Sequence, residues 1–334
     1  MKKLKLIVIL FLLTSYLFSQ QIHTPAEIFK IISDSKLSYE VKIIDKTIEC
    51  PDYSKKLNYH DNYRVVTDSG LYTYSFEPDD RAKPLFSKAE SLFQSNIDSA
   101  LYYYKLSLEA DSSLYNVMTY IGQMYEGKDD WKNAIKWYKT AISKNYIDYM
   151  AHWFLADAYL KTGDIKSAVD EITIAQILNR NNPRIKKAMM TIFKKAKLKT
   201  DDWCFNPQVE MTKVADNKIS LAFNQKWTGY AMAKALWTYE PGYSESMGVS
   251  PGTYSTLEDK ECLISLLISL ENSKTKIKKD PPLYILKKTA DKKFLDEYIL
   301  YEIVLPQNPF VAFQLPEETI LRIKEYILSV RNAK

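Results

Sequence analysis

Small and large side chains between Tyr115 and Asn182 follow one pattern that occurs twice, with a spacing of 34 residues. When the first copy is laid over the second, small residues meet small residues and large apolar residues meet large apolar ones. The matched pairs are Tyr115 with Tyr149, Ile121 with Leu155, Gly122 with Ala156, Tyr125 with Tyr159, Trp131 with Ile165, Ala134 with Ala168, Tyr138 with Ile172, and Ala141 with Ala175. Small residues let two helices approach closely, and large ones fill the space between neighbouring helix pairs. Each copy therefore predicts two antiparallel helices, joined by breaker residues at 127–130 and 162–164.

The pattern continues beyond both ends of this stretch. Residues 84–111 carry Ala89 and Ala100 at equivalent positions, so they predict a first repeat with a tighter turn. Behind the third repeat, Asn182-Pro183 begins one more amphipathic helix. The apolar face of this helix consists of Ile185, Met189, Ile192 and Ala196. Because the end of a stack of helical repeats needs a cap with one polar face, we expect this helix to be the cap.

A 34-residue period of paired helices resembles the tetratricopeptide repeat family. The resemblance implies an α-solenoid of three hairpins, at about 81–114, 115–148 and 149–182, followed by a capping helix that ends near residue 200. It also implies a function, because members of this family are scaffolds for protein–protein or protein–peptide interaction.

In this family the first helix of each repeat lines a concave face, and positions two, five, nine and twelve point into it. The resemblance places eight residues of this chain there: Asn116, Thr119, Gln123, Glu126, Met150, Trp153, Asp157 and Leu160. The first repeat adds Phe86, Glu90 and Phe93. Family members that clamp the C-terminal carboxylate of a peptide use lysine, arginine and asparagine at such positions, whereas the residues here are neutral or acidic. We therefore expect an extended ligand with apolar and basic side chains; the alternative is that Trp153 packs against another part of the chain.

Two further regions flank the repeats, which are expected to occupy residues 81–200. In residues 21–80, a capping box at Thr24–Glu27 predicts a short helix, and the alternation from Leu37 to Ile43 predicts a strand. Short strands are also expected between 63 and 76, and we expect the whole segment to pack on the first repeat.

Residues 201–334 lose the 34-residue register and predict an α-rich C-terminal domain in which we recognise no family. Residues 225–240 predict a helix that is apolar nearly all round and therefore buried. Three more helices are expected after Ser255, around Phe294 and after Pro316. The fold class predicted for the chain is mostly α, with minor β structure in the N-terminal segment.

Residues 1–20 have the pattern of a secretory signal peptide. Three lysines begin the segment, an apolar run from Leu6 to Leu13 follows, and cleavage is expected after Ser19 or Gln20. We therefore expect an exported protein, periplasmic or secreted, with no transmembrane span after cleavage. Removal of the three lysines lowers the formal net charge from +5 to +2, which gives no reason to expect nucleic acid as a partner.

The chain has three cysteines, Cys50, Cys204 and Cys262. In an oxidising compartment one disulfide and one free thiol can form, with three possible pairings. The alternative is that all three are small buried apolar side chains.

Candidate catalytic features are few. The string Gly248–Gly252 spells G-x-S-x-G, but Pro251 has no backbone N–H for an oxyanion hole, and no strand or downstream histidine accompanies it. Lys234 falls inside the apolar face of its helix, where burial would lower its pKa and make it a base or Schiff-base nucleophile. The alternative is that its stem packs on tryptophan while its ammonium group lies in water or pairs with Glu240 or Glu245.

No motif for a metal, a nucleotide or another cofactor occurs, so none is expected. We therefore expect a repeat scaffold that binds a protein or peptide in the cell envelope, in preference to an enzyme. The first alternative is a hydrolase or lyase with its site in the C-terminal domain. The second is a glycan-binding protein that uses an aromatic platform made of Trp227, Tyr230, Trp237, Tyr239 and Tyr243.

Overall fold

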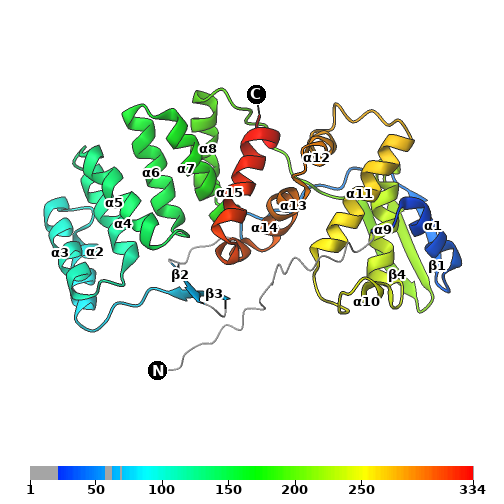
Figure 1. Cartoon of the computed structure of the whole chain (residues 1–334), viewed down its shortest axis with the longest axis horizontal. Coiled ribbons are helices and arrows are strands. Elements are labelled where there is room, and N and C mark those ends of the chain that lie inside the picture. Colours follow the sequence, from blue (N-terminus) through cyan, green and yellow to red (C-terminus); the bar gives the residue numbers. More distant parts are fainter. Residues whose placement is uncertain (1–21, 57–61, 68–69, 334) are drawn as a thin grey trace. The chain divides into compact units, whose positions relative to one another are not determined.

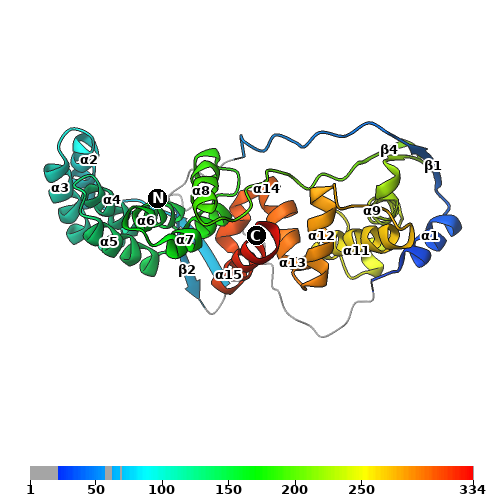
Figure 2. The same ribbon diagram turned by 90° about the horizontal axis from the view of Figure 1, so that it is seen from above.

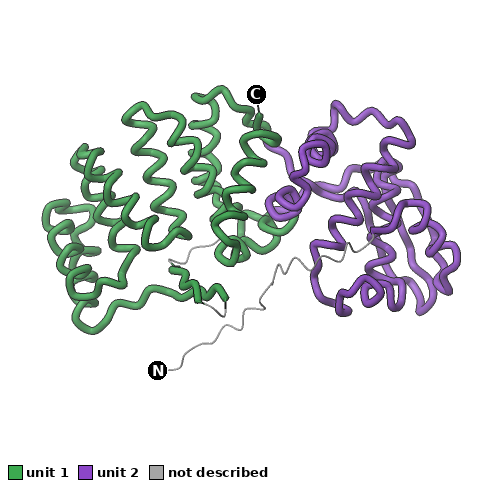
Figure 3. The backbone as a smooth tube through the Cα atoms, viewed as in Figure 1, with its two compact units in different colours: residues 1–12, 53–201, 303–334 green, residues 13–52, 202–302 purple. Residues whose placement is uncertain are grey.

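A computed structural model of the chain describes residues 22–56, 62–67 and 70–333. The signal peptide predicted at residues 1–20 lies outside the described residues. The chain is mostly helical, as predicted (Figure 1). Its contacts form two compact units (Figure 3). One unit, the repeat unit, contains Tyr53–Asp201 and Ile303–Lys334; the other, the mixed unit, contains Asp202–Glu302 and the described residues before Tyr53.

The repeat unit contains the three predicted hairpins and the helix behind them. Figures 1 and 2 show the helices stacked in chain order. Their bounds are α2 (Ala82–Leu92), α3 (Ile97–Ala110), α4 (Tyr115–Glu126), α5 (Trp131–Lys144), α6 (Tyr149–Thr162), α7 (Ile165–Leu178) and α8 (Pro183–Lys195). The second helix of each hairpin begins at a capping side chain, Asn96, Asp130 or Asp164, which accepts a hydrogen bond from the backbone N–H three residues later. The tetratricopeptide-like arrangement predicted from the 34-residue spacing is therefore present.

Small residues lie where the helices of a hairpin approach each other. Gly122 of α4 has no room for a side chain, because a Cβ atom there would lie 2.4 Å from Cε1 of Tyr138 on α5. Ala134 and Ala168, the equivalent small residues of α5 and α7, are completely buried. The matched positions of the two sequence copies are thus matched positions of close packing.

The end of the chain returns to the repeats. Helix α15 (Glu317–Tyr326) packs on α7, and Lys324 forms an ion pair with Asp170 at 3.0 Å. Short helical turns precede this helix along the chain: η2 (Ile299–Val304), α14 (Leu305–Gln307) and η3 (Pro309–Gln314). The turn η4 (Ile327–Arg331) follows it. Every residue of α7 from Ile172 to Leu178 is buried, so α8 alone does not cover it. The C-terminal residues supply the second cover, and residues 201–334 do not form one unit.

A β-hairpin also belongs to the repeat unit. It consists of β2 (Asn62–Thr67) and β3 (Gly70–Ser75), paired antiparallel with Tyr63 opposite Tyr74. Tyr63 packs edge-on against Tyr115 of α4, with ring centroids 6.2 Å apart. Asn145 donates to the carbonyl of Asn62 at 2.8 Å, which fixes the hairpin to the end of α5.

The mixed unit combines a small sheet with helices. Its strands are β1 (Ser38–Ile43), β4 (Val209–Ala215) and β5 (Lys218–Phe223), in the order β1-β5-β4, with β1 parallel and β4 antiparallel to β5. Its helices are α1 (Pro25–Asp34), η1 (Gln225–Trp227), α9 (Thr228–Tyr239), α10 (Tyr243–Ser246), α11 (Thr256–Asn272), α12 (Pro281–Asp291) and α13 (Leu295–Tyr298). Helix α1 and strand β1 were expected on the first repeat; β1 instead pairs with β5, and α1 packs on α9.

The two faces of this sheet differ. Ile219, Leu221 and Phe223 of β5 are buried, and this face packs against Ala231 and Ala235 of α9. The other face is polar and carries exposed ion pairs, Glu40 with Lys218 at 2.8 Å and Lys46 with Glu210 at 2.6 Å. Strand β1 is therefore part of a two-layer unit, sheet and helices, in which the second face of the sheet carries exposed charged residues.

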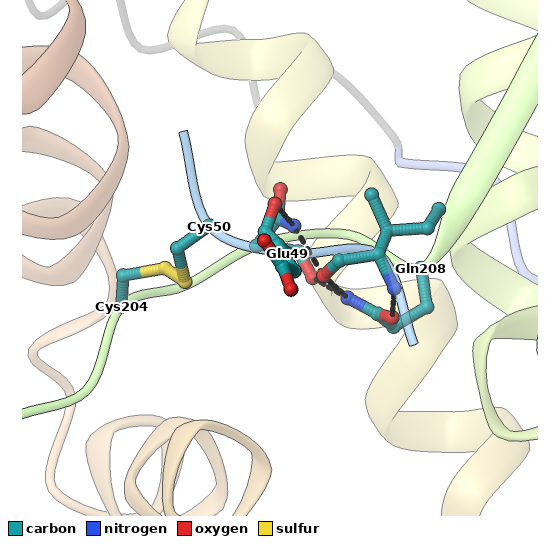
Figure 4. The surroundings of a disulfide bond; sticks show 6 residues. Glu49, Cys50, Cys204 and Gln208 are labelled. Carbon is teal, nitrogen blue, oxygen red and sulfur yellow. Dashed lines mark hydrogen bonds between the residues drawn. A yellow bond between two sulfur atoms is a disulfide. The ribbon is translucent and has the colours of Figure 1, made fainter. Parts of the chain in front are cut away.

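A disulfide joins Cys50 to Cys204, one of the three pairings that the sequence left open (Figure 4). Cys262 is a free, buried thiol. Beside the disulfide, the Gln208 side chain accepts from the N–H of Ile48 at 2.6 Å and donates to its carbonyl at 3.1 Å. The bond closes a loop of 154 residues, and long loops gain most from such a cross-link.

The close packing of the hairpins predicts the effect of a larger side chain. Ala168→Phe should lower the free energy of unfolding by roughly 1–3 kcal/mol or more, because nothing in the buried contact can accept a ring. Lys132→Ala, an exposed change on α5, should cost close to zero. Urea melts of the two variants check this, and equal midpoints would contradict the helix register.

Candidate functional site: the first-helix row of the repeats

The eight residues assigned to the concave face lie on α4 and α6. Within each helix the spacings of three and four residues place them along one side. Two of them are buried: Asn116 is 7% exposed and Thr119 is fully covered. The other six are partly buried: Gln123, Glu126, Met150, Trp153, Asp157 and Leu160.

Thr119 connects two repeats. Its hydroxyl donates to Oδ2 of Asp148 at 2.7 Å. The other oxygen of Asp148 caps α6 by accepting from the N–H groups of Met150 and Ala151 at 3.1 and 2.9 Å. The hydroxyl hydrogen of Thr119 is thus used in the contact between α4 and α6, and Thr119 positions the row rather than presenting a group to a ligand.

Two carboxylates with raised pKa values, Glu126 and Asp157, lie further along the row. Burial raises the pKa of Asp157 to about 6, and the negative charge of Glu126 adds to this shift. Burial also raises the pKa of Glu126, although Tyr138 donates a hydrogen bond to Oε2 of Glu126 at 2.7 Å. Lys161 lowers both pKa values without cancelling either shift. The pair therefore carries negative charge that its surroundings do not fully compensate.

Trp153 lies one helical turn before Asp157 and stacks on Phe154, with ring centroids 5.4 Å apart. Its Nε1 atom is buried and makes no well-aligned hydrogen bond within the described residues, although its proximity lowers the pKa of Asp157. The indole is partly buried. An aromatic surface thus adjoins Asp157 on the same helix, α6.

The first repeat uses the same kind of contact. Tyr104 of α3 donates to Glu90 of α2, just as Tyr138 of α5 donates to Glu126 of α4. Phe86 and Phe93 pack against Tyr104, with ring centroids 6.1 and 6.4 Å away. From the sequence these tyrosines were expected only to fill space; their hydrogen bonds to carboxylates were not foreseen, because the acids occupy different positions in the two repeats.

Lys234 in the mixed unit does not fit a catalytic role. It forms an ion pair with Glu258 at 2.5 Å. Burial is the largest single influence and lowers its pKa, but the charge and hydrogen bond of Glu258, together with Cys262 and Asp259, outweigh burial, and the net shift is upward. A lysine with a raised pKa is a poor base and a poor Schiff-base nucleophile. The expected partners Glu240 and Glu245 are not the residues that pair with it; Glu240 accepts from Ser35 and Tyr39.

The other candidate features of the mixed unit are structural. Ser250 lies in an irregular loop without a preceding strand, and Gly248 and Gly252 have positive φ angles of 73° and 71°. Four of the five aromatic residues proposed as a glycan platform are buried, with exposures of 4 to 9%: Trp227, Tyr230, Trp237 and Tyr243. Such a platform needs exposed rings, so this arrangement does not support it.

The buried aromatic residues surround a carboxylate that the sequence did not reveal. Glu261 of α11 is fully buried and accepts hydrogen bonds from Nε1 of Trp237 at 2.6 Å and from the hydroxyl of Tyr243 at 2.8 Å. The backbone N–H of His23 donates to its other oxygen at 2.8 Å. Glu261 thereby fixes the start of α1 to α11, across a sequence separation of 238 residues.

No protein-family description matches the chain, and no curated protein matches it either. Solved structures with a similar backbone are tetratricopeptide repeat domains. The first such domain of Spaghetti (RPAP3), bound to an HSP90 peptide, is 19% identical with a TM-score of 0.34; the match covers 35% of this chain and 94% of that one. The Yersinia enterocolitica type III secretion chaperone SycD, in complex with a peptide of the translocator YopD, is 19% identical with a TM-score of 0.33, over 35% of this chain and 96% of that one.

A second structure of SycD is 16% identical with a TM-score of 0.33, and the match covers 36% of this chain and 90% of that one. At these identities the likeness concerns the fold of the repeats alone. The rest of the chain has no counterpart in these matches.

The carboxylate pair predicts a gain in stability when one charge is removed. In an acid whose folded pKa is raised, ionisation destabilises the fold at pH values above that pKa, and the cost disappears as the pH falls toward the unfolded pKa. Asp157→Asn should therefore raise the free energy of unfolding at pH 7.5 by on the order of 1–2 kcal/mol, discounted for partial exposure. The gain should shrink at pH 5.

Urea melts at the two pH values check this expectation. The exposed Asp129→Asn variant is the control and should change little at either pH. A loss of stability in Asp157→Asn at pH 7.5 would mean that the charge of Asp157 is compensated in the folded protein.

Proposed function

We propose that the repeat unit is a scaffold that binds an extended peptide segment through a basic side chain. The observation that carries this proposal is the pair Glu126 and Asp157, two partly buried carboxylates of one row. Burial raises the pKa of both, and the charge of Glu126 raises that of Asp157 further. A lysine or arginine side chain placed beside both would replace their repulsion by attraction in a partly desolvated site. The protein keeps this costly arrangement in the free state, as binding sites commonly do.

The neighbouring residues fit the apolar part of such a ligand. Met150, Trp153 and Leu160 lie on the same side of α6 and keep part of their surface accessible. A flat indole next to carboxylates suits the stem and the head of a long cationic side chain. The ligand of this proposal is therefore a protein or peptide with alternating basic and apolar side chains.

We further propose that the protein acts in the cell envelope, either in the periplasm or after secretion. The signal-peptide pattern of residues 1–20 supports export. The Cys50–Cys204 disulfide supports an oxidising compartment, because such bonds persist outside the cytosol. No helix among the described residues is long and apolar enough to cross a membrane.

Peptide binding predicts a defined pattern of losses. On an array of synthetic peptides, the protein should retain peptides that combine lysine or arginine with apolar residues, and Trp153→Ala should lose them without a change of melting midpoint. For a retained peptide, affinity should fall at least several-fold from pH 7.5 to pH 5, because protonation of Asp157 near pH 6 removes half of the paired charge.

Two controls separate binding from folding. Asp157→Asn should bind weakly at both pH values and should lose the pH dependence, while Asp129→Asn should behave as the unchanged protein. Retention of acidic peptides, or equal binding by Asp157→Asn at pH 7.5, would overturn the proposed ligand class. If Trp153→Ala unfolds, the indole is a core residue and the binding face lies elsewhere.

Export predicts the covalent state of the protein recovered from its host. The intact mass should correspond to a chain that begins at Gln20 or Gln21 and is lighter by two hydrogen atoms in its oxidised form, which reduction should restore. Recovery of intact Met1 in a membrane pellet, or a fully reduced chain, would contradict the proposed compartment.

A further inference from the structure

Strand β1 is an edge of the sheet in the mixed unit, since the strand order is β1-β5-β4. Its register places Val41 opposite Leu221 and Ile43 opposite Phe223. Val41 and Ile43 therefore lie on the same face of the sheet as Leu221 and Phe223, which α9 covers at the central strand β5. Leu221 and Phe223 are buried, yet Val41 and Ile43 are 48% and 50% exposed. The apolar layer of the sheet is therefore open at this edge.

Within the described residues, the backbone at this edge offers hydrogen-bonding groups that no other strand pairs with. The N–H groups of Ser38 and Ile44 point to β5, donating to Asn217 and Phe223 at 2.7 and 3.0 Å. In a parallel pair, successive residues direct their N–H and C=O groups to opposite sides. Tyr39, Val41 and Ile43 consequently direct theirs away from β5, where a further strand can pair.

The sequence of β1 is complementary to itself in one antiparallel register. With Val41 opposite Val41 of a second copy, Tyr39 faces Ile43 and Glu40 faces Lys42. Aromatic residues opposite β-branched ones and opposite charges facing each other both stabilise a strand pair. The residues with outward backbone groups face one another in this register, so they form the hydrogen-bonded pairs.

The neighbouring registers are disfavoured. A shift that centres the pair on Glu40 places two glutamates opposite each other, and a shift that centres it on Lys42 does the same with two lysines. A shift by a single residue, so that Val41 faces Glu40 or Lys42, would place backbone groups that point away from β5 opposite groups that point toward it. It would also place apolar side chains opposite charged ones. Of these registers, only the one centred on Val41 satisfies both the backbone and the side chains.

We propose that two copies of this chain associate through antiparallel pairing of β1, which forms a continuous six-stranded sheet in the order β4-β5-β1-β1-β5-β4. A second copy is the occupant because the complementarity is reciprocal, as a two-fold symmetric interface requires. Pairing buries Val41 and Ile43 and gives the outward backbone groups their partners. A lysine on an edge strand disfavours pairing with other strands, and among the registers above only this one places Lys42 opposite a glutamate.

Charge exchange tests the register in solution. Sedimentation of the purified protein over a range of concentrations should show a reversible monomer–dimer equilibrium. Glu40→Lys and Lys42→Glu should each weaken the dimer at least tenfold, because each places like charges opposite each other twice. The double variant restores opposite charges and should recover most of the affinity. A protein that remains monomeric at all concentrations, or single variants that dimerise as well as the double variant, would overturn the proposal.

Cross-linking provides a second measurement that does not depend on affinity. In the proposed register Val41→Cys places the two Cys residues opposite each other, with their Cα atoms about 5.5 Å apart. This distance lies within the range of disulfides, so mild oxidation should give a covalent dimer. Glu40→Cys is the matched control, because its thiols are offset along the strands and should not join. Equal cross-linking of the two variants would mean random encounter and contradict β1 pairing.

A proline variant separates pairing from folding. The N–H of Val41 points away from β5, so Val41→Pro should leave the sheet and the melting midpoint nearly unchanged and should abolish the dimer. A folded Val41→Pro protein that still dimerises would place the interface elsewhere. If Val41→Pro unfolds, the two cysteine variants decide between the outcomes.

Discussion

The repeat unit depends on the close approach of two helices at Gly122. Because this position has no Cβ atom, the ring of Tyr138 lies against the backbone of α4. There the hydroxyl of Tyr138 reaches Glu126 at 2.7 Å. Glu126 in turn raises the pKa of Asp157 on the next repeat. A constraint of packing thus determines where two acids meet.

The same sequence of contacts explains why the proposed site is costly in the free protein. Tyr138 is completely buried and gives Glu126 a single neutral donor, and the indole N–H of Trp153 lowers the pKa of Asp157 without cancelling the effect of burial. Buried carboxylates without a paired cation destabilise a fold. A basic ligand would remove this destabilisation of the free protein, and its removal would contribute to the free energy of binding.

Much of the repeat unit was predictable because its packing repeats along the sequence. Gly122 and Ala134 recur as Ala156 and Ala168, and this spacing identifies the helix pairs without any long-range information. The second cover of α7 was missed. Five of the seven buried residues from Ile172 to Leu178 are apolar, and Thr173 and Gln176 are buried as well, so the helix needs more than one neighbour.

Contacts between distant segments were not predictable from local pattern. The alternation in β1 indicated a strand, but nothing in it identifies β5, about 180 residues away, as the partner. The three cysteines likewise allowed several pairings, and only the fold selects Cys50 with Cys204. For the site, the family pattern placed Glu126 and Asp157 on the row, whereas the effect of Glu126 on the pKa of Asp157 required the arrangement of α4, α5 and α6.

The central claim is that Glu126 and Asp157 form an uncompensated pair that a basic side chain completes. The most direct measurement is the titration of the Asp157 carboxyl by NMR, in the free protein and with a bound lysine-containing peptide. The account predicts a pKa of about 6 in the free protein and a clear decrease on binding. An ordinary aspartate pKa in the free protein, or a pKa that the peptide does not change, would contradict it.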